Sequence, residues 1–126
     1  MTTWDLSGTR RLVLLCNGST CKELGSDKVA TRLRRLIEEH GLDPAVHTVR
    51  TRCLGRCDDG CTVVVQPDNI WYREITPALA ERIVEEHLLH DRPVRKYVSY
   101  EPQEGALTPR SGTRPGKQKK GKKGAR

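Results

Sequence analysis

Two pairs of cysteines restrict the folds that are open to this chain of 126 residues. The pairs have the spacings C-x4-C and C-x3-C, and they lie in separate segments: Cys16 with Cys21, and Cys53 with Cys57. Thiolates that converge on one point form a metal or cluster site, because sulfur ligands select Zn²⁺ or iron–sulfur clusters. A fold that uses all four must therefore bring two distant segments together.

The residues around the cysteines have the pattern of a β-α-β unit. Apolar runs at 10–16 and 45–50 predict two strands, of which the second is weaker. Between them, an apolar stripe at helical spacing predicts a helix over 27–40, with Ser26 or Asp27 as its cap. Parallel strands of such a unit end at the same edge of the sheet, so we expect both cysteine pairs to emerge there.

A hairpin and a second helix are expected after the cysteine loops. Residues 61–66 and 70–74 predict antiparallel strands joined by a turn at 67–69. The next helix is expected to begin at Thr76-Pro77, where a hydroxyl can cap it and proline suits the first position. Residues 94–107 are expected to add a short extended segment over the body.

Together these elements predict an α/β (α+β) fold in the order β-α-β-β-β-α. It contains a four-stranded mixed sheet and two main helices, which is the thioredoxin-like arrangement. Trp71 and Tyr72 are neighbours on one strand and face opposite ways, so one is expected in the core and the other at the surface. The four histidines, His87 among them, are expected at the surface.

The net charge of +7 is unevenly distributed along the chain. Eight of the 23 lysines and arginines and none of the 16 acidic residues lie in residues 108–126. Residues 1–107 therefore hold 15 basic and 16 acidic side chains, a net charge of −1. We expect a folded domain at 1–107 and a disordered basic tail at 108–126. This distribution argues against a folded body that binds nucleic acid through a positive face.

The apolar pattern near the N-terminus and the number of cysteines both bear on the cellular compartment in which the protein is expected. The apolar run near the N-terminus, Leu12 to Cys16, is too short for a membrane span or a signal peptide, so a cytoplasmic protein without a membrane span is expected. In a reducing cytosol, five cysteines are more readily metal ligands or redox thiols than structural disulfides, and their odd number agrees with this.

Several other classes of protein lack support in the sequence. A plant-type ferredoxin needs a third cysteine soon after C-x4-C, but Leu24 stands there. A thioredoxin-type dithiol needs C-x-x-C, which is absent, and no Ser/His/carboxylate motif indicates a hydrolase. Structural zinc fits the four thiols, although zinc sites favour tighter spacings, so a zinc-stabilised binding module stays open as an alternative.

The joint pattern of these segments is similar to a known family. It comprises Cys53-Leu54-Gly55-Arg56-Cys57 with Gly60, the pair Cys16 and Cys21, and the stretch from Ile70-Trp71-Tyr72 to Leu88. Over residues 10–90 this resembles the thioredoxin-like [2Fe–2S] ferredoxins, which are related to the iron–sulfur subunit of respiratory NADH dehydrogenase. No short motif within it is specific alone.

The resemblance implies a [2Fe–2S] cluster bound by Cys16, Cys21, Cys53 and Cys57. It also implies a one-electron carrier that is not itself an enzyme and that delivers electrons to a partner oxidoreductase. The partner is unnamed, and a homodimer is left open. The basic tail is expected to contact an acidic protein or nucleic acid; under the zinc alternative it would engage nucleic acid.

Three further residues in or beside the cysteine loops have expected roles near the cluster. Cys61 stands where the family commonly has proline. We expect it to be a buried strand residue, and the alternative hypothesis is that it serves as a substitute ligand. Gly55 and Gly60 are expected to allow positive φ angles in a loop folded around a cluster, with free backbone N–H groups directed at sulfur.

Overall fold

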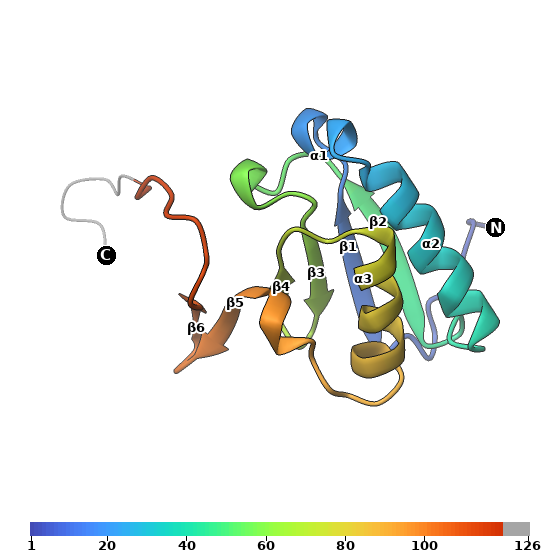
Figure 1. The fold of residues 1–126 in the computed structure, drawn as a ribbon. Coiled ribbons are helices and arrows are strands. Elements are labelled where there is room, and N and C mark those ends of the chain that lie inside the picture. The colour runs from blue at the N-terminus through green and yellow to red at the C-terminus, as the bar shows by residue number, and fades with distance from the viewer. Residues whose placement is uncertain (120–126) are drawn as a thin grey trace.

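A computed structural model describes residues 1–119 of the chain, and the sheet and helices form two layers (Figure 1). The elements follow in this order: β1 (Arg11–Cys16), α1 (Ser19–Glu23), α2 (Ser26–Glu39), β2 (Val46–Thr51), η1 (Cys57–Asp59), β3 (Val63–Gln66), β4 (Ile70–Tyr72), α3 (Pro77–Arg82), η2 (Ile83–Leu88), η3 (Arg95–Tyr97), β5 (Val98–Gln103) and β6 (Ala106–Pro109). Of the short helices, η1 and η3 are 3₁₀ turns, and η2 is a π-helical continuation of α3.

The sheet has six strands in the order β2-β1-β3-β4-β5-β6. Only β1 and β2 are parallel, and every other neighbouring pair is antiparallel. The predicted β-α-β unit and the predicted hairpin of β3 and β4 are therefore both present. The prediction of four strands and two main helices is wrong in its counts, because β5 and β6 extend the sheet and α1 is a third α-helix.

Sequence analysis expected a short extended segment at 94–107 but not a second hairpin, which β5 and β6 form. In β6 three of the four residues are exposed, so its sequence has no buried apolar alternation that would reveal a strand. The hairpin depends instead on its backbone ladder and on the turn at Glu104 and Gly105, whose φ angles are 51° and 83°. Two consecutive positive φ angles are typical of the tight turn that suits a two-residue hairpin loop.

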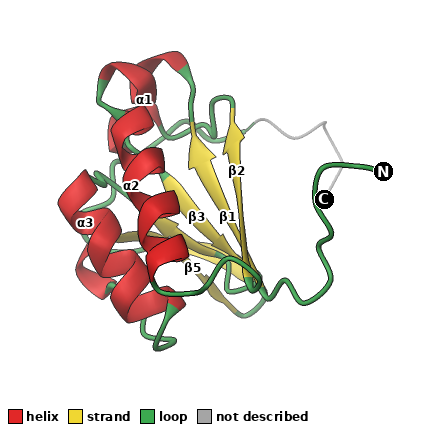
Figure 2. Ribbon diagram, turned by 90° about the vertical axis from the view of Figure 1, so that its right-hand side faces the viewer, coloured by secondary structure: helices red, strands yellow, loops and turns green. Residues whose placement is uncertain are grey.

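The long helices pack on one face of the sheet, as Figure 2 shows. The core between the layers consists of aliphatic side chains from β1, β3, β4, α2 and the α3–η2 segment. Thr76 caps α3 as predicted, its Oγ1 accepting a hydrogen bond of 3.3 Å from the backbone N–H of Leu79. The cap predicted for α2 is wrong, because Gly25, with φ at +96°, occupies the N-cap and no side chain caps the helix.

The boundary expected after residue 107 falls inside β6. The division into a domain of 1–107 and a tail of 108–126 stays a prediction, and residues 120–126 lie outside the described part of the chain. No helix within residues 1–119 is long and apolar enough to cross a membrane.

A buried polar chain links β4 to η2 and to the turn between β3 and β4. One of the two aromatic residues of β4 was expected in the core, and Tyr72 lies there. Trp71 is half-buried. The surface position expected for His87 is wrong, since its side chain is fully buried. His87 Nδ1 lies 2.7 Å from the Tyr72 hydroxyl, and its Nε2 lies 2.8 Å from Asp68 Oδ2. Burial lowers the pKa of His87, although the Asp68 carboxylate acts in the opposite direction.

A neutral His87 satisfies every member of this chain. Its Nε2–H donates to Asp68, and its Nδ1 accepts the Tyr72 hydroxyl proton. The Tyr72 oxygen in turn accepts a hydrogen bond of 3.0 Å from the backbone N–H of Val94. Burial also raises the pKa of Tyr72, so the phenol stays protonated as this arrangement requires.

Replacing Tyr72 by phenylalanine should lower the free energy of unfolding by about 1–3 kcal/mol, because it leaves the Val94 N–H and His87 Nδ1 buried without partners. Urea denaturation followed by circular dichroism measures the change. Tyr97→Phe is the matched control, since among residues 1–119 the Tyr97 hydroxyl has no hydrogen-bond partner. Equal stability of the two variants would contradict the role given to this chain.

Candidate metal centre

The parallel pairing of β1 with β2 brings both cysteine segments to one edge of the sheet. The pairing runs in register from Arg11 opposite Val46 to Cys16 opposite Thr51. Cys16 is the last residue of β1, and Cys53 follows the end of β2 by two residues. The structure therefore places the two cysteine segments where the strand topology predicted them (Figure 1).

The two loops touch through backbone at Gly18. A Cβ atom at Gly18 would lie 2.9 Å from the Cys53 Cα and 3.1 Å from the Cys53 backbone nitrogen. The neighbouring Asn17 N–H donates a hydrogen bond of 2.9 Å to the Thr51 carbonyl oxygen. Only glycine allows this approach, because the atoms that a side chain would meet belong to the backbone.

The four thiols form a buried pair and an exposed pair. Cys16 and Cys21 are buried, whereas Cys53 and Cys57 are exposed, with their sulfur atoms 3.5 Å apart. Within residues 1–119, no group of three or more Cys, His, Asp or Glu side chains converges closely enough to hold a single metal ion. Two pairs of thiols at one edge suit a two-iron cluster, in which each iron takes two cysteines.

Two of the four thiols, those of Cys21 and Cys57, have raised pKa values. Burial raises the pKa of Cys21 to about 12; a hydrogen bond from the Thr62 backbone lowers this value, and the nearby Cys16 thiol raises it. The Cys53 thiol raises the pKa of Cys57, and a hydrogen bond with Thr20 lowers it. A bound cation reverses this preference, because metal ligation takes the thiolate and releases the proton.

The glycines of the second loop behave differently from each other. Gly55 has φ at +84°, and its N–H donates to the Cys53 sulfur over 3.2 Å, which confirms the expectation for this residue. Gly60 has φ at −61°, so the positive angle expected there is wrong. Its lack of a side chain matters for space instead, since a Cβ atom would lie 3.1 Å from the Cys21 sulfur.

Cys61 and Thr62 adjoin the buried pair. Cys61 is 3 % exposed within the core, and its thiol donates to the Cys21 carbonyl oxygen over 3.6 Å. Burial raises its pKa, and its role as a substitute ligand stays a prediction. Thr62 is 2 % exposed, and its hydroxyl has no hydrogen-bond partner among the described residues. A buried donor without a partner fits an acceptor that the protein atoms do not supply, such as cluster sulfur.

Sequence analysis also missed a buried acid beside Cys57. Asp59 is 1 % exposed and accepts hydrogen bonds from the Arg56 side chain, one of them from Nε at 2.8 Å. Its own backbone oxygen accepts from the Glu74 N–H at 2.7 Å. The only sequence signal was the i, i+3 spacing of Arg56 and Asp59, which is too common to mark a buried pair.

Comparison with known proteins agrees with this geometry. The chain is 43% identical over 110 residues to a protein of Priestia megaterium assigned as a 2Fe-2S ferredoxin, covering 86% of each chain. No family model matches the sequence. A solved thioredoxin-like [2Fe-2S] ferredoxin of Aquifex aeolicus superposes with a TM-score of 0.70 at 26% identity, over 79% of this chain and 99% of that one. The chain belongs to the thioredoxin-like [2Fe–2S] ferredoxins.

Membership in this family gives the site its cofactor, a [2Fe–2S] cluster, and gives the chain its function as an electron-carrying ferredoxin. The thioredoxin-like α+β fold is likewise confirmed. A more distant likeness joins this ferredoxin to a chain of an NAD+-reducing [NiFe]-hydrogenase. That match has a TM-score of 0.52 at 15% identity, over 79% of this chain and 17% of the other, and it shows the fold alone.

Replacing Gly18 by alanine should separate the two loops, because the added methyl group overlaps the Cys53 backbone. We expect at least a severalfold loss of bound iron per chain, together with weaker visible absorption. Ser19→Ala is the control, since Ser19 is exposed and adjacent in sequence. Iron bound at the wild-type level by the Gly18→Ala protein would show that the close approach is not needed.

Proposed function

We propose that Cys16, Cys21, Cys53 and Cys57 ligate the [2Fe–2S] cluster, and that this ferredoxin delivers single electrons to a partner oxidoreductase without being an enzyme itself. The observation that carries the proposal is the meeting of a buried and an exposed thiol pair at one sheet edge. When bound, the cluster supplies a centre that gains and loses one electron without bond rearrangement in the protein.

The difference between the pairs gives each a separate task. The buried pair, Cys16 and Cys21, excludes water from the inner side of the site, where Gly60 leaves room for the Cys21 sulfur. The exposed pair, Cys53 and Cys57, reaches the surface and gives a partner protein a short path to the site. Because transfer between proteins needs close approach, we infer that electrons leave on the side of the exposed pair.

Backbone and hydroxyl donors would stabilise the sulfur atoms as thiolates. The Gly55 N–H already contacts the Cys53 sulfur, and a Thr62 backbone hydrogen bond lowers the pKa of Cys21. Hydrogen bonds to sulfur and burial are two of the factors that set the reduction potential of an iron–sulfur cluster. The chain thereby contributes to the potential as well as to binding.

Anaerobic purification tests the cofactor and its ligands together. We expect two iron and two sulfide ions per chain, visible absorption that dithionite bleaches, and a paramagnetic signal in the reduced state. Alanine at any of the four proposed ligands should abolish stable binding, whereas Cys61→Ala should keep the spectrum. A colourless protein with stoichiometric zinc would overturn the proposal in favour of the zinc-stabilised binding module. Loss of the spectrum in Cys61→Ala would make Cys61 a ligand.

Thr62→Val should make the reduction potential more negative by about 30–60 mV, a threefold to tenfold change in the one-electron equilibrium. Thr62 lies opposite Cys16, because the Cys16 N–H donates to the Thr62 carbonyl oxygen at 3.1 Å, so both side chains share one face of the sheet. Its hydroxyl can therefore donate to sulfur there. Redox titration measures the shift, and Thr62→Ser should restore the wild-type value. An unchanged potential in Thr62→Val would mean that the hydroxyl does not donate to sulfur.

A cytoplasmic location, a homodimer, and contact of the tail with an acidic protein or nucleic acid stay predictions. Four of the eight basic residues of 108–126 lie within the described part of the chain: Arg110, Arg114, Lys117 and Lys119. The other four lie in residues 120–126.

A further inference from the structure

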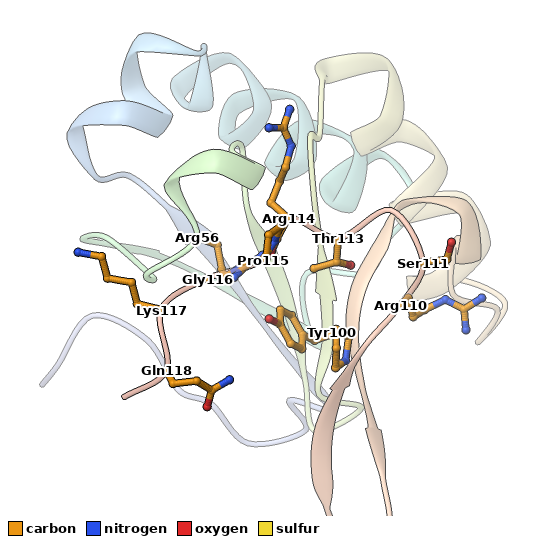
Figure 3. A pocket seen from close by; sticks show the side chains of 11 residues that line it. Arg56, Tyr100, Arg110, Ser111, Thr113, Arg114, Pro115, Gly116, Lys117 and Gln118 are labelled. Atoms are coloured by element: carbon orange, nitrogen blue, oxygen red, sulfur yellow. The ribbon is translucent and has the colours of Figure 1, made fainter. Parts of the chain in front are cut away.

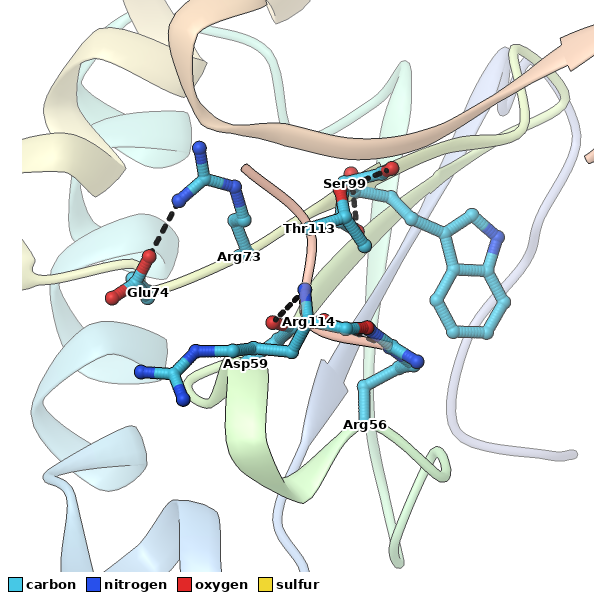
Figure 4. A network of polar contacts seen from close by, with 8 residues as sticks. Arg56, Asp59, Arg73, Glu74, Ser99, Thr113 and Arg114 are labelled. Atoms are coloured by element: carbon cyan, nitrogen blue, oxygen red, sulfur yellow. Dashed lines mark hydrogen bonds and ion pairs between the residues drawn. The ribbon is translucent and has the colours of Figure 1, made fainter. Parts of the chain in front are cut away.

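The C-terminal segment of residues 110–119, here called the strap, runs from β6 back to the second cysteine loop. Near its start, the Arg110 N–H donates to the Ser99 carbonyl oxygen over 2.8 Å. The Thr113 hydroxyl donates to the same oxygen over 2.9 Å (Figure 4). Ser99 belongs to β5 and is 1 % exposed. The strap is thus attached to the sheet itself.

A second attachment joins the strap to the loop that carries Cys57. Asp59 Oδ1 accepts a long hydrogen bond of 3.4 Å from the Arg114 N–H, and the Arg56 guanidinium donates to the Arg114 carbonyl oxygen over 2.7 Å. Arg56 also pairs with Asp59 (Figure 4). Because Asp59 is buried, this ion pair with Arg56 holds the loop and the strap in one arrangement.

These attachments place the strap beside the exposed thiol pair. Pro115 and Gly116 line a small cavity of about 220 Å³ together with residues 55–58, which include Cys57. A larger cavity of about 560 Å³ lies between the strap, Arg56 and Tyr100 (Figure 3). A protein that approaches Cys57 on the side of this cavity therefore also meets the strap.

The strap carries four cations and no acid within residues 110–119. Arg110 pairs with Glu101, and Arg56 of the loop pairs with Asp59. The side chains of Arg114 and Lys117 form no ion pair with any residue of 1–119 and extend away from the cavity in Figure 3. The exposed Arg52 directly precedes Cys53 in the second cysteine loop, and Arg52, Arg114 and Lys117 are here called the basic rim.

We propose that the basic rim, Arg52, Arg114 and Lys117, is the docking surface for an acidic redox partner protein. The proposal rests on the proposed function, because the rim matters only if electrons leave beside Cys53 and Cys57. Complementary charge at that site steers encounter and fixes orientation more than it adds affinity. Nucleic acid is the weaker fit, since the aromatic ring that lines the cavity beside the strap, Tyr100, is covered by the Arg56 guanidinium at 5.0 Å.

Electron transfer to two haem proteins of opposite charge tests this surface. The cluster-loaded ferredoxin is reduced and mixed with acidic cytochrome b5 or basic cytochrome c, and one electron converts ferric to ferrous haem in each. At low salt, Arg114→Glu/Lys117→Glu should slow transfer to cytochrome b5 by about tenfold or more, and added salt should remove the difference. Transfer to cytochrome c should not slow.

A matched control separates docking from net charge. Arg10→Glu/Arg92→Glu makes the same change in charge on exposed side chains that form no ion pair among residues 1–119, Arg10 before the start of β1 and Arg92 after η2. It should change the rate with cytochrome b5 less than threefold, and an effect as large as that of the rim variant would overturn the proposal. Lys117→Glu alone, which leaves Arg114 intact, should show a smaller loss of the same kind.

The remaining outcomes are also decisive. An unchanged rate in both rim variants would overturn the docking surface and leave the ferredoxin function intact, whereas a wild-type protein without iron–sulfur absorption would overturn the proposed function. A single-stranded oligonucleotide of about 20 nucleotides serves as the last probe. If the rim variant lost binding to it and kept the rate with cytochrome b5, the rim would be a nucleic-acid contact and the proposal would be wrong.

Discussion

The contact between Gly18 and the Cys53 backbone is the constraint on which the rest of the site depends. Strand pairing alone brings the loops to one edge, since β1 and β2 are parallel and in register up to Cys16 and Thr51. Sulfur ligation requires much finer placement, and a tetrahedral iron tolerates little error in ligand position. The glycine removes the side chain that would hold the loops apart, so the second loop lies directly against the first.

Without its cofactor, the site contains buried groups whose surroundings are energetically unfavourable. Burial alone makes ionisation of Cys21 unfavourable, and the buried Thr62 hydroxyl has no partner in the described part of the chain. A bound [2Fe–2S] cluster would offset both costs, because its iron would stabilise the thiolates and its sulfur atoms would accept hydrogen bonds. The polar chain of Tyr72, His87 and Asp68, in contrast, is fully satisfied by protein groups. The fold therefore satisfies this polar chain by itself, whereas the groups of the cysteine site need the cofactor.

The sequence was sufficient for those parts of the fold in which burial leaves a periodic trace. The β-α-β unit and the hairpin of β3 and β4 carry such a trace and were predicted, and the Thr76 cap was predicted from its hydroxyl and the proline that follows it. The β5–β6 hairpin was not, because its stability comes from backbone hydrogen bonds and turn geometry rather than apolar alternation. The surface position predicted for His87 was wrong, because its burial depends on Tyr72 and Asp68, which are distant in sequence. The burial of Asp59 was missed, because its spacing from Arg56 is too common to recognise.

The position of the strap shows where part of the chain's positive charge lies in the structure. From the sequence, the cations after residue 107 formed a separate tail beside a body of net charge −1. In the structure, Asp59 and Ser99 fix residues 110–116 against that body, so part of this charge lies next to Cys57. Cations at that position act on whatever approaches the exposed thiols and on the negative charge of a reduced cluster. Long-range attraction and local tuning of the site would then arise from one short segment.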